Sequence, residues 1–220
     1  LYSIPMSVIG LSYSVAAFPG FARSVVEGRH QEFSNGVVHV ARHILFWSLP
    51  FVALFIVLRA HIVRIILGAG HFGWEDTRLT AAALALFSIA IVAQGFIMLF
   101  IRAFHAAEQA TVPLVAGGIS GALTVALGYG LAQSWGVSGG GWHWLDAVLR
   151  VADLSGTSVL ALPLAFSVGS ILNAAILAIW FSFSFGVRLK TWLRSFTEHG
   201  AATAALSIVS YEVLQWSVPV

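Results

Sequence analysis

The chain has 220 residues, of which 59% are hydrophobic and 9% charged, with a mean hydropathy of +0.90. Soluble domains carry roughly a quarter charged residues, so this composition excludes an ordinary soluble domain and predicts an all-α polytopic membrane protein. The net charge is only +2 and the basic residues lie between apolar runs, so nucleic acid is not an expected partner. The chain has no cysteine, which excludes disulfides, thiol nucleophiles and cysteine-ligated metals.

Six apolar runs predict about six transmembrane helices, the last of them cut short by the end of the sequence. Because each span needs roughly 20 residues, no room is left for a separate soluble domain. The chain starts without Met or a basic leader and ends in apolar residues, so we expect a fragment of a longer polytopic protein. The expected spans are 1–20, 37–58, 79–101, 113–132, 159–186 and 200–216.

Two of the connections between these runs are amphipathic. Residues 23–36, between the first two runs, mix charged and apolar side chains and predict a short interfacial helix. Residues 142–154 follow a Gly-rich turn and are rich in Trp, a residue that prefers the depth of the lipid headgroups. We therefore expect an amphipathic interfacial insertion at 142–154.

Two prolines and two glycines predict how the spans bend and pack. Pro50 and Pro163 each remove a backbone hydrogen bond from an apolar run, so we expect them to bend helices. Gly117 and Gly121 lie four residues apart, and small residues at this spacing let helix backbones approach closely. We therefore expect the span at 113–132 to pack inside a bundle.

The basic residues predict the orientation of the chain in the membrane. Alternating spans put seven Lys and Arg residues on one face and four on the other, and the positive-inside rule makes the first face cytoplasmic. The seven are Arg23, Arg29, Arg42, Arg102, Arg188, Lys190 and Arg194, and the four are Arg59, Arg64, Arg78 and Arg150.

Arg42 and Arg102 are the candidate substrate-binding residues, because each lies beside a long apolar run near the predicted cytoplasmic face. A guanidinium at that depth can bind a phosphate or diphosphate through two parallel hydrogen bonds. The alternative is that both arginines only mark the membrane boundary. Asn173 lies in the middle of a span, where its amide binds either a ligand or a neighbouring helix.

Three further patterns formally match known sites and have simpler explanations. His39 and His43 share a helix face, as in a two-histidine metal site, but no third ligand is evident, and an interfacial position explains them. Residues 68–73 match G-x-G-x-x-G, but a membrane helix precedes them where a dinucleotide site needs a strand. Glu75 and Asp76 fit the start of a helix better than paired acid and base groups. We expect no catalytic residue, metal or cofactor.

Several segments of the chain resemble the MurJ (MviN) lipid II flippase family. The best match, residues 62–113, contains a G-x-F-x-x-x-D turn, a span, the sequence R-A-F-H-A and then T-x-P. Residues 5–19 (PMSVIGLSYSVAAFP) and 161–177 (ALPLAFSVGSILNAAIL) are similar to two further family segments. Ser7 replaces the first glycine of the family pattern, and the insertion at 134–158 is longer than the family's usual connection.

The resemblance implies part of the C-lobe of a MATE-like, two-lobed transporter in the bacterial inner membrane. Such a transporter moves undecaprenyl-linked peptidoglycan precursor to the outer leaflet by alternating access around a cationic cavity, without enzymatic chemistry or a nucleotide. The implied partners are the lipid-linked precursor, membrane lipids, the remainder of the transporter chain and cell-wall synthesis enzymes. Two alternatives remain: an exporter of polysaccharide-lipid units or drugs with the same fold, and a non-transporting scaffold for cell-wall enzymes.

Overall fold

The computed structural model describes residues 2–68, 73–135, 143–151, 153–154 and 156–187. Every regular element within these ranges is a helix, and five helices are long and apolar enough to cross a membrane. This confirms the predicted all-α polytopic membrane fold. The sixth expected run, 200–216, lies outside the described residues. The five spanning helices are Ser3–Val26, His30–Leu67, Trp74–Ala106, Thr111–Trp135 and Thr157–Phe185.

The first spanning helix contains a turn of π-helix. It consists of α1 (Ser3–Met6), the π-helical η1 (Ser7–Leu11) and α2 (Ser12–Val26). After α2 the chain reverses at Gly28, whose positive φ of 70° suits a residue without a side chain. The predicted interfacial helix at 23–36 is therefore wrong, because these residues form the end of α2, a tight turn and the start of α3.

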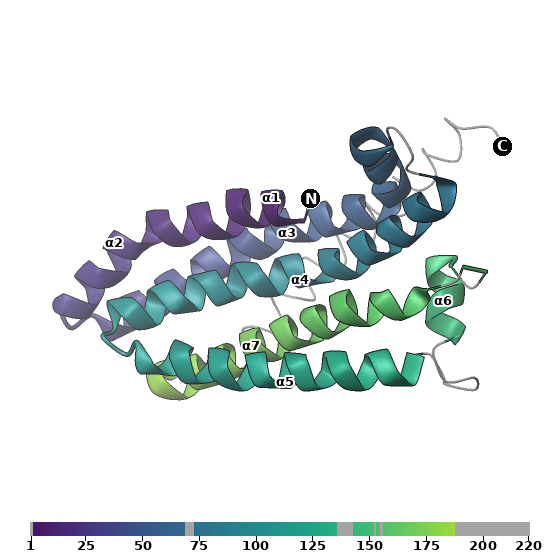
Figure 1. The fold of residues 1–220 in the computed structure, drawn as a ribbon. Helices are drawn as coiled ribbons and strands as arrows, with labels where there is room; N and C mark the ends of the chain where they lie inside the picture. Colours follow the sequence, from purple (N-terminus) through teal and green to yellow (C-terminus); the bar gives the residue numbers. More distant parts are fainter. Residues whose placement is uncertain (1, 69–72, 136–142, 152, 155, 188–220) are drawn as a thin grey trace.

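The second spanning helix, α3 (His30–Leu67), has 38 residues and continues well beyond the expected boundary at residue 58. At 1.5 Å per residue it is about 57 Å long, whereas the hydrocarbon core of a bilayer is about 30 Å thick. Its last turns leave the line of the bundle, as the dark blue ribbon in Figure 1 shows. Helix α3 is thus longer than one crossing of the apolar core requires.

The central helix of the bundle is α4 (Trp74–Ala106), which packs against α2, α3 and α7. Its first turn is capped by Asp76, which accepts a hydrogen bond of 2.9 Å from the backbone N–H of Gly73. Alanines fill much of its buried surface, and such small side chains allow neighbouring helices to come close. The buried alanines of α4 are Ala81, Ala82, Ala85, Ala90, Ala93, Ala103 and Ala106.

The remaining helices form a second layer beside α4. Helix α5 (Thr111–Trp135) packs against α7 (Ala161–Phe185), and α7 also packs against α4. Between them lie the short α6 (His143–Leu149), inside the predicted insertion at 142–154, and the 3₁₀ turn η2 (Thr157–Leu160). Buried Leu145 and Leu149 join α6 to the apolar core shared with α4 and α7.

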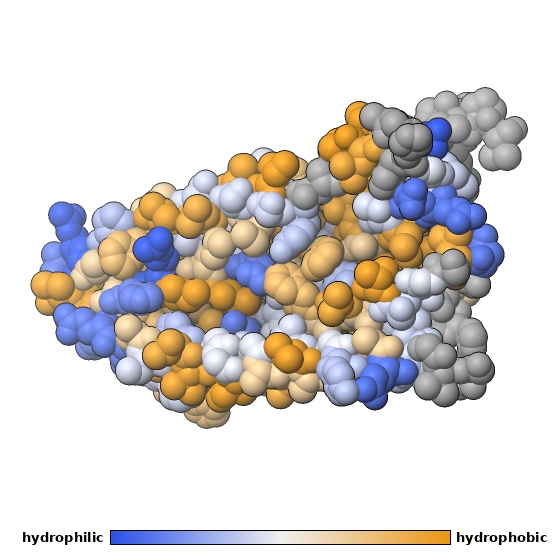
Figure 2. Space-filling view, viewed as in Figure 1, coloured by the Kyte–Doolittle hydropathy of each residue, from blue (hydrophilic) through white to orange (hydrophobic). Residues whose placement is uncertain are grey.

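The helix ends form two groups at opposite ends of the bundle. The turns that follow α2, α4 and α7 lie together at the left of Figure 1, and the connections from α3 to α4 and from α5 to α7 lie at the right. Hydrophilic side chains gather mainly at these two ends in Figure 2, with apolar side chains along much of the length between them. The left end is the face predicted to be cytoplasmic, although Arg188, Lys190 and Arg194 lie outside the described residues.

Aromatic side chains pack together at two places along the bundle. Near the left end, five phenylalanines from α3, α4 and α7 form a cluster with ring centroids 4.8 to 6.3 Å apart. Toward the other end, Tyr2 stacks on Phe87 with centroids 4.9 Å apart and meets the edge of Phe166. Offset and edge contacts of this kind add specific geometry to apolar burial. The five are Phe33, Phe100, Phe104, Phe181 and Phe185.

Candidate functional site

Arg42 lies in a polar cavity of about 450 Å³ between α3 and the end of α7. Gln31, Asn35, His39 and Arg42 line one wall, because spacings of three and four residues place them on the same face of α3. The other wall is residues 185–187, where Gly186 ends α7 with a positive φ of 68°. The Arg42 cavity thus offers amide, imidazole and guanidinium groups, which can together bind an anion.

Two contacts shape this cavity. The hydroxyl of Ser34 donates to the carbonyl of His30 at 2.9 Å and to that of Phe185 at 3.4 Å, which ties α3 to the end of α7. His39 and His43 approach with their Nε2 atoms 3.1 Å apart, so one ring donates to the other. The predicted histidine pair is therefore bonded to itself, and Tyr13 of α2 stacks on His43 with centroids 5.9 Å apart.

Arg102 occupies a different place from Arg42. It is partly buried near the end of α4, at the same end of the bundle, but it is not among the described residues that line the Arg42 cavity. A common site for the two guanidinium groups therefore stays a prediction. Arg42 lies on α3 and Arg102 on α4, at the same end of the bundle.

Asn173 lines a second, open cavity of about 270 Å³ between α4, α5 and α7. Gly117 and Gly121 line the same cavity, so the structure brings together three residues that the sequence analysis selected separately. Asn173 Oδ1 is buried without a hydrogen-bond donor, while Gln94 Nε2 donates to Ser170 Oγ at 2.9 Å on the same cavity wall. An amide oxygen left unsatisfied in this way favours a ligand or water that can donate a hydrogen bond.

The glycine pair of α5 does not make the close contact that its spacing predicts within the described residues. A side chain added at Gly117 or Gly121 would meet nothing within 4 Å, because both glycines border the open Asn173 cavity. That Gly117 and Gly121 pack against another helix stays a prediction, and the partner would have to lie outside the described residues.

Close helix contacts occur instead at glycines that the sequence analysis did not select as packing residues. A Cβ atom at Gly10 would lie 2.9 Å from the Cα atom of Gly95, so η1 and α4 touch backbone to backbone. A Cβ atom at Gly169 of α7 would clash with the hydroxyl of Thr124 in α5. Neither contact has a local sequence signature, because each joins one glycine to a residue far away in the chain.

The two prolines selected for bending occupy different positions. Pro50 lies in the interior of α3, where it leaves the carbonyl four residues earlier without its usual backbone donor. Pro163 lies in the first turn of α7, directly after η2, where a proline is accommodated without breaking the helix. Helix bending at both prolines stays a prediction, and the position of Pro50 gives it the stronger physical basis.

An ion pair that the sequence analysis missed holds α6 and the residues that follow it up to 154 (the α6 segment) against α4. Arg78 donates to both carboxylate oxygens of Asp153, at 2.7 and 2.5 Å, and to the carbonyl of Arg150. The hydrogen bond from Arg78 lowers the pKa of the Asp153 carboxyl below its usual value. Arg150 has a positive φ of 59°, so the chain turns sharply at the residue whose carbonyl Arg78 binds.

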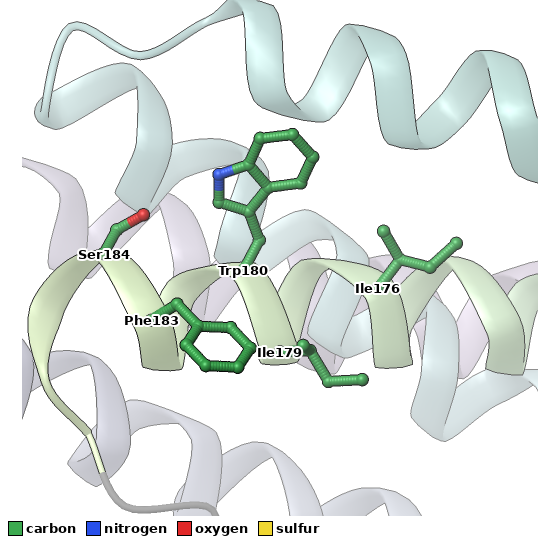
Figure 3. Close-up of a pocket in the computed structure, with 5 residues that line it drawn as sticks. All are labelled: Ile176, Ile179, Trp180, Phe183 and Ser184. Carbon is green, nitrogen blue, oxygen red and sulfur yellow. The ribbon is translucent and has the colours of Figure 1, made fainter.

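Apolar side chains of α7 border a further cavity, of about 440 Å³ (Figure 3). In this view Trp180 points to the opposite side of the helix from Ile179 and Phe183. These three side chains are exposed over 42 to 83% of their surface, a pattern expected where a helix faces lipid or another part of a membrane protein.

The comparison with known families decides what kind of membrane protein this is. The sequence profile of the lipid II flippase MurJ family matches residues 1–141, which include Arg42, Arg102 and the Gly117–Gly121 pair. The chain belongs to this family. The resemblance seen in the sequence is confirmed, and Pro163 and Asn173 lie beyond the matched region.

Curated relatives agree with this assignment. The probable lipid II flippase MurJ of Rhizobium meliloti (strain 1021) is 28% identical over 94% of this chain and 42% of its own length. The protein of the same name from Rhizobium tropici is 27% identical over 67% of this chain and 29% of its own length. The protein of the same name from Thermotoga maritima is 27% identical over 63% of this chain and 28% of its own length. The chain therefore spans less than half the length of these relatives, and no solved structure matches it.

Proposed function

We propose that the chain is part of a flippase that moves undecaprenyl-linked peptidoglycan precursor from the cytoplasmic to the outer leaflet of the bacterial inner membrane. The family assignment and five membrane-spanning helices support this function. The observation that carries it to particular residues is the Arg42 cavity, a polar hollow at the end of the bundle predicted to be cytoplasmic. A lipid headgroup that enters from the cytoplasm needs hydrogen-bond donors near that end of the bundle.

In this proposal Arg42 and Arg102 attract the diphosphate of the precursor. A guanidinium binds two phosphate oxygens at once, whereas the amides of Gln31 and Asn35 hydrogen-bond to neutral sugar or peptide groups. Asn173 offers its unsatisfied oxygen to a donor on the cargo or to water in the bundle. The chain acts as a transporter by alternating access between two lobes, driven by an electrochemical gradient and assisted by cell-wall enzymes as partners.

Precursor transport in cells depleted of their own lipid II flippase tests the proposal. The full gene product should restore arrival of the precursor at the outer leaflet, and Arg42→Ala and Arg102→Ala should each lower this about 10-fold, the loss expected for a charge-assisted hydrogen bond. Arg29→Ala is the matched control, because Arg29 lies at the same end but is paired with Glu27 and Glu32. Full restoration by both test variants would reduce the arginines to topology markers. Failure of the correctly inserted wild type would overturn the function itself.

A further inference from the structure

The end of the bundle opposite the Arg42 cavity contains a cavity of about 720 Å³ between α3, α4 and the α6 segment. Its polar lining is unusually basic for a face that the positive-inside rule makes external. Three arginines from three different elements line it, together with a histidine and the ring of Trp74. The basic residues are Arg59 and His61 of α3, Arg78 of α4 and Arg150 after α6.

The fourth arginine of this face belongs to the same group. The guanidinium of Arg64 lies over the ring of Trp74, 5.4 Å from its centroid, and Trp74 lines the cavity. All four arginines assigned to the external face therefore gather at one place. Arginines that only mark a membrane boundary need not converge in this way.

The positive charge of this cavity is only partly balanced. Among the ion pairs of the described residues, Asp153 with Arg78 is the one formed by a residue that lines the cavity. Arg59 is partly buried and donates one hydrogen bond of 2.9 Å to the carbonyl of Ile56, which leaves further guanidinium donors for a ligand. Two guanidinium groups in one cavity repel each other, and an anion between them removes that cost.

A separate apolar groove lies toward the middle of the bundle, along the same helix faces as the basic cavity. This groove, of about 460 Å³, lies between α3, α4 and α7 and is lined almost entirely by aliphatic side chains. On α3, Leu49 and Val52 of the groove are followed at helical spacing by Ile56 and Arg59 of the cavity. On α4, residues 96, 92 and 89 of the groove and residues 81, 78 and 74 of the cavity likewise share one face. A basic cavity and an apolar groove on one seam match an anionic headgroup with its hydrocarbon tail.

We propose that this basic cavity binds the phosphate groups of a membrane lipid at the external end of the bundle. The phosphate belongs either to a polyprenyl diphosphate or to an anionic glycerophospholipid, and both present the same oxygens to Arg59 and Arg150. Only the polyprenyl diphosphate alternative rests on the proposed transport function. Binding of a glycerophospholipid requires no transport.

Native mass spectrometry of the full gene product in detergent tests this site by counting bound lipid. Wild-type protein is titrated with undecaprenyl diphosphate, phosphatidylglycerol and, as the uncharged reference, phosphatidylcholine. Arg59→Gln and Arg150→Gln should each weaken binding of the preferred anionic lipid about 10-fold, since each removes charge-assisted hydrogen bonds. Arg29→Gln, which removes the same charge at the other end of the bundle, should leave binding unchanged. Arg59→Lys keeps the charge but loses the planar pair of donors, so its affinity should lie between those of Arg59→Gln and wild type.

The outcomes separate the site, its ligand and the transport function. Displacement of phosphatidylglycerol by equimolar undecaprenyl diphosphate identifies the polyprenyl lipid, and the reverse result identifies the glycerophospholipid. Equal loss in Arg29→Gln, or wild-type binding in both test variants, overturns the site whatever the transport assay shows. If the variants unfold, inorganic pyrophosphate competing with lipid on Arg42→Ala, which lacks the proposed diphosphate-binding arginine at the other end of the bundle, supports the site, and the absence of competition there overturns it.

Discussion

Gly10 and Gly95 show how closely two membrane helices approach when neither residue carries a side chain. Helix η1 meets α4 at this point, and Ile44 of α3 closes the other side of Gly95. Since lipid tails are as apolar as the helix surfaces, dispersion contacts at short range are the main attraction between such helices. A single methyl group at this contact therefore has a large effect, whereas the same group elsewhere on the helix has little.

Gly10→Ala tests this contact. Its methyl group would lie 2.9 Å from a backbone atom that cannot rotate away, so we expect the free energy of unfolding to fall by about 1 to 3 kcal/mol. Gly20→Ala is the control in the same spanning helix, where the new methyl meets nothing within 4 Å and should stabilise by up to about 1 kcal/mol. Reversible unfolding in mixed detergent measures both. Equal effects would contradict a close contact at Gly10.

At the scale of elements, the Arg78–Asp153 pair holds the α6 segment to the bundle. Helix α6 has only seven residues, too few to be stable alone, so its position depends on packing and on this ion pair. Arg78 also donates to the carbonyl of Arg150, and both arginines line the basic cavity. Loss of Asp153 would therefore loosen one wall of that cavity.

The ion pair predicts a particular pH dependence of α6. Arg78 lowers the pKa of the Asp153 carboxyl in the folded protein. The ionised carboxylate therefore holds α6 fully above the unfolded pKa of about 3.9, and this constraint is lost as the pH falls through the lowered folded pKa. The 220 residues contain no cysteine, so a spin label attached at Val148→Cys reports the mobility of α6. We expect label mobility in wild type to rise only below about pH 4, and in Asp153→Asn to be high and independent of pH.

Glu75→Gln is the matched control for this measurement. Glu75 is an exposed carboxylate at the same end of α4 that acts on Arg78 only through longer-range electrostatics and, within the described residues, makes no direct ion pair with it. The control should keep the wild-type pH profile. A label that is equally mobile in wild type and Asp153→Asn at neutral pH would show that apolar packing alone holds α6.

For the whole molecule, the alternating direction of successive crossings determines which connections share a side of the membrane. The turns after α2, α4 and α7 lie at one end, and the connections before α4 and α7 lie at the other (Figure 1). Only the charge distribution assigns these ends to membrane faces, with seven basic residues against four. If the basic cavity binds a lipid, the three arginines that line it serve that lipid in addition to contributing to topology.

Reporter fusions test the orientation. We expect green fluorescent protein to fluoresce when fused after Gln109 or Val187, on the cytoplasmic side. We expect alkaline phosphatase to be active when fused after Gly68 or Asp153, on the external side. The inverted pattern would place the Arg42 cavity outside the cell and contradict its proposed role in loading precursor, while a mixed pattern would contradict the five crossings.

Local sequence patterns predicted most of the helices of this fold. They did not predict the contacts between residues that are far apart in the sequence. The charge-free run at 79–101 marks α4, because a helix in lipid satisfies its own backbone. The apolar span was expected to end near residue 58, and α3 continues through Arg59 and Arg64 to Leu67, where these side chains bind a carbonyl and an aromatic ring of the protein. The pairing of Arg78 with Asp153 joins residues 75 apart, and no periodicity encodes such a distance.

The π-helical turn in the first spanning helix makes the length of that helix as important as its composition. One extra residue within η1 shifts the register of the residues before it, so deleting a residue from Ser7–Leu11 would rotate them by about 100° around the axis. Tyr2 would then leave its stack on Phe87 and its edge contact with Phe166. A deletion here should therefore be tolerated less well than most single substitutions in the same segment, and relatives that share this aromatic contact should share the helix length as well.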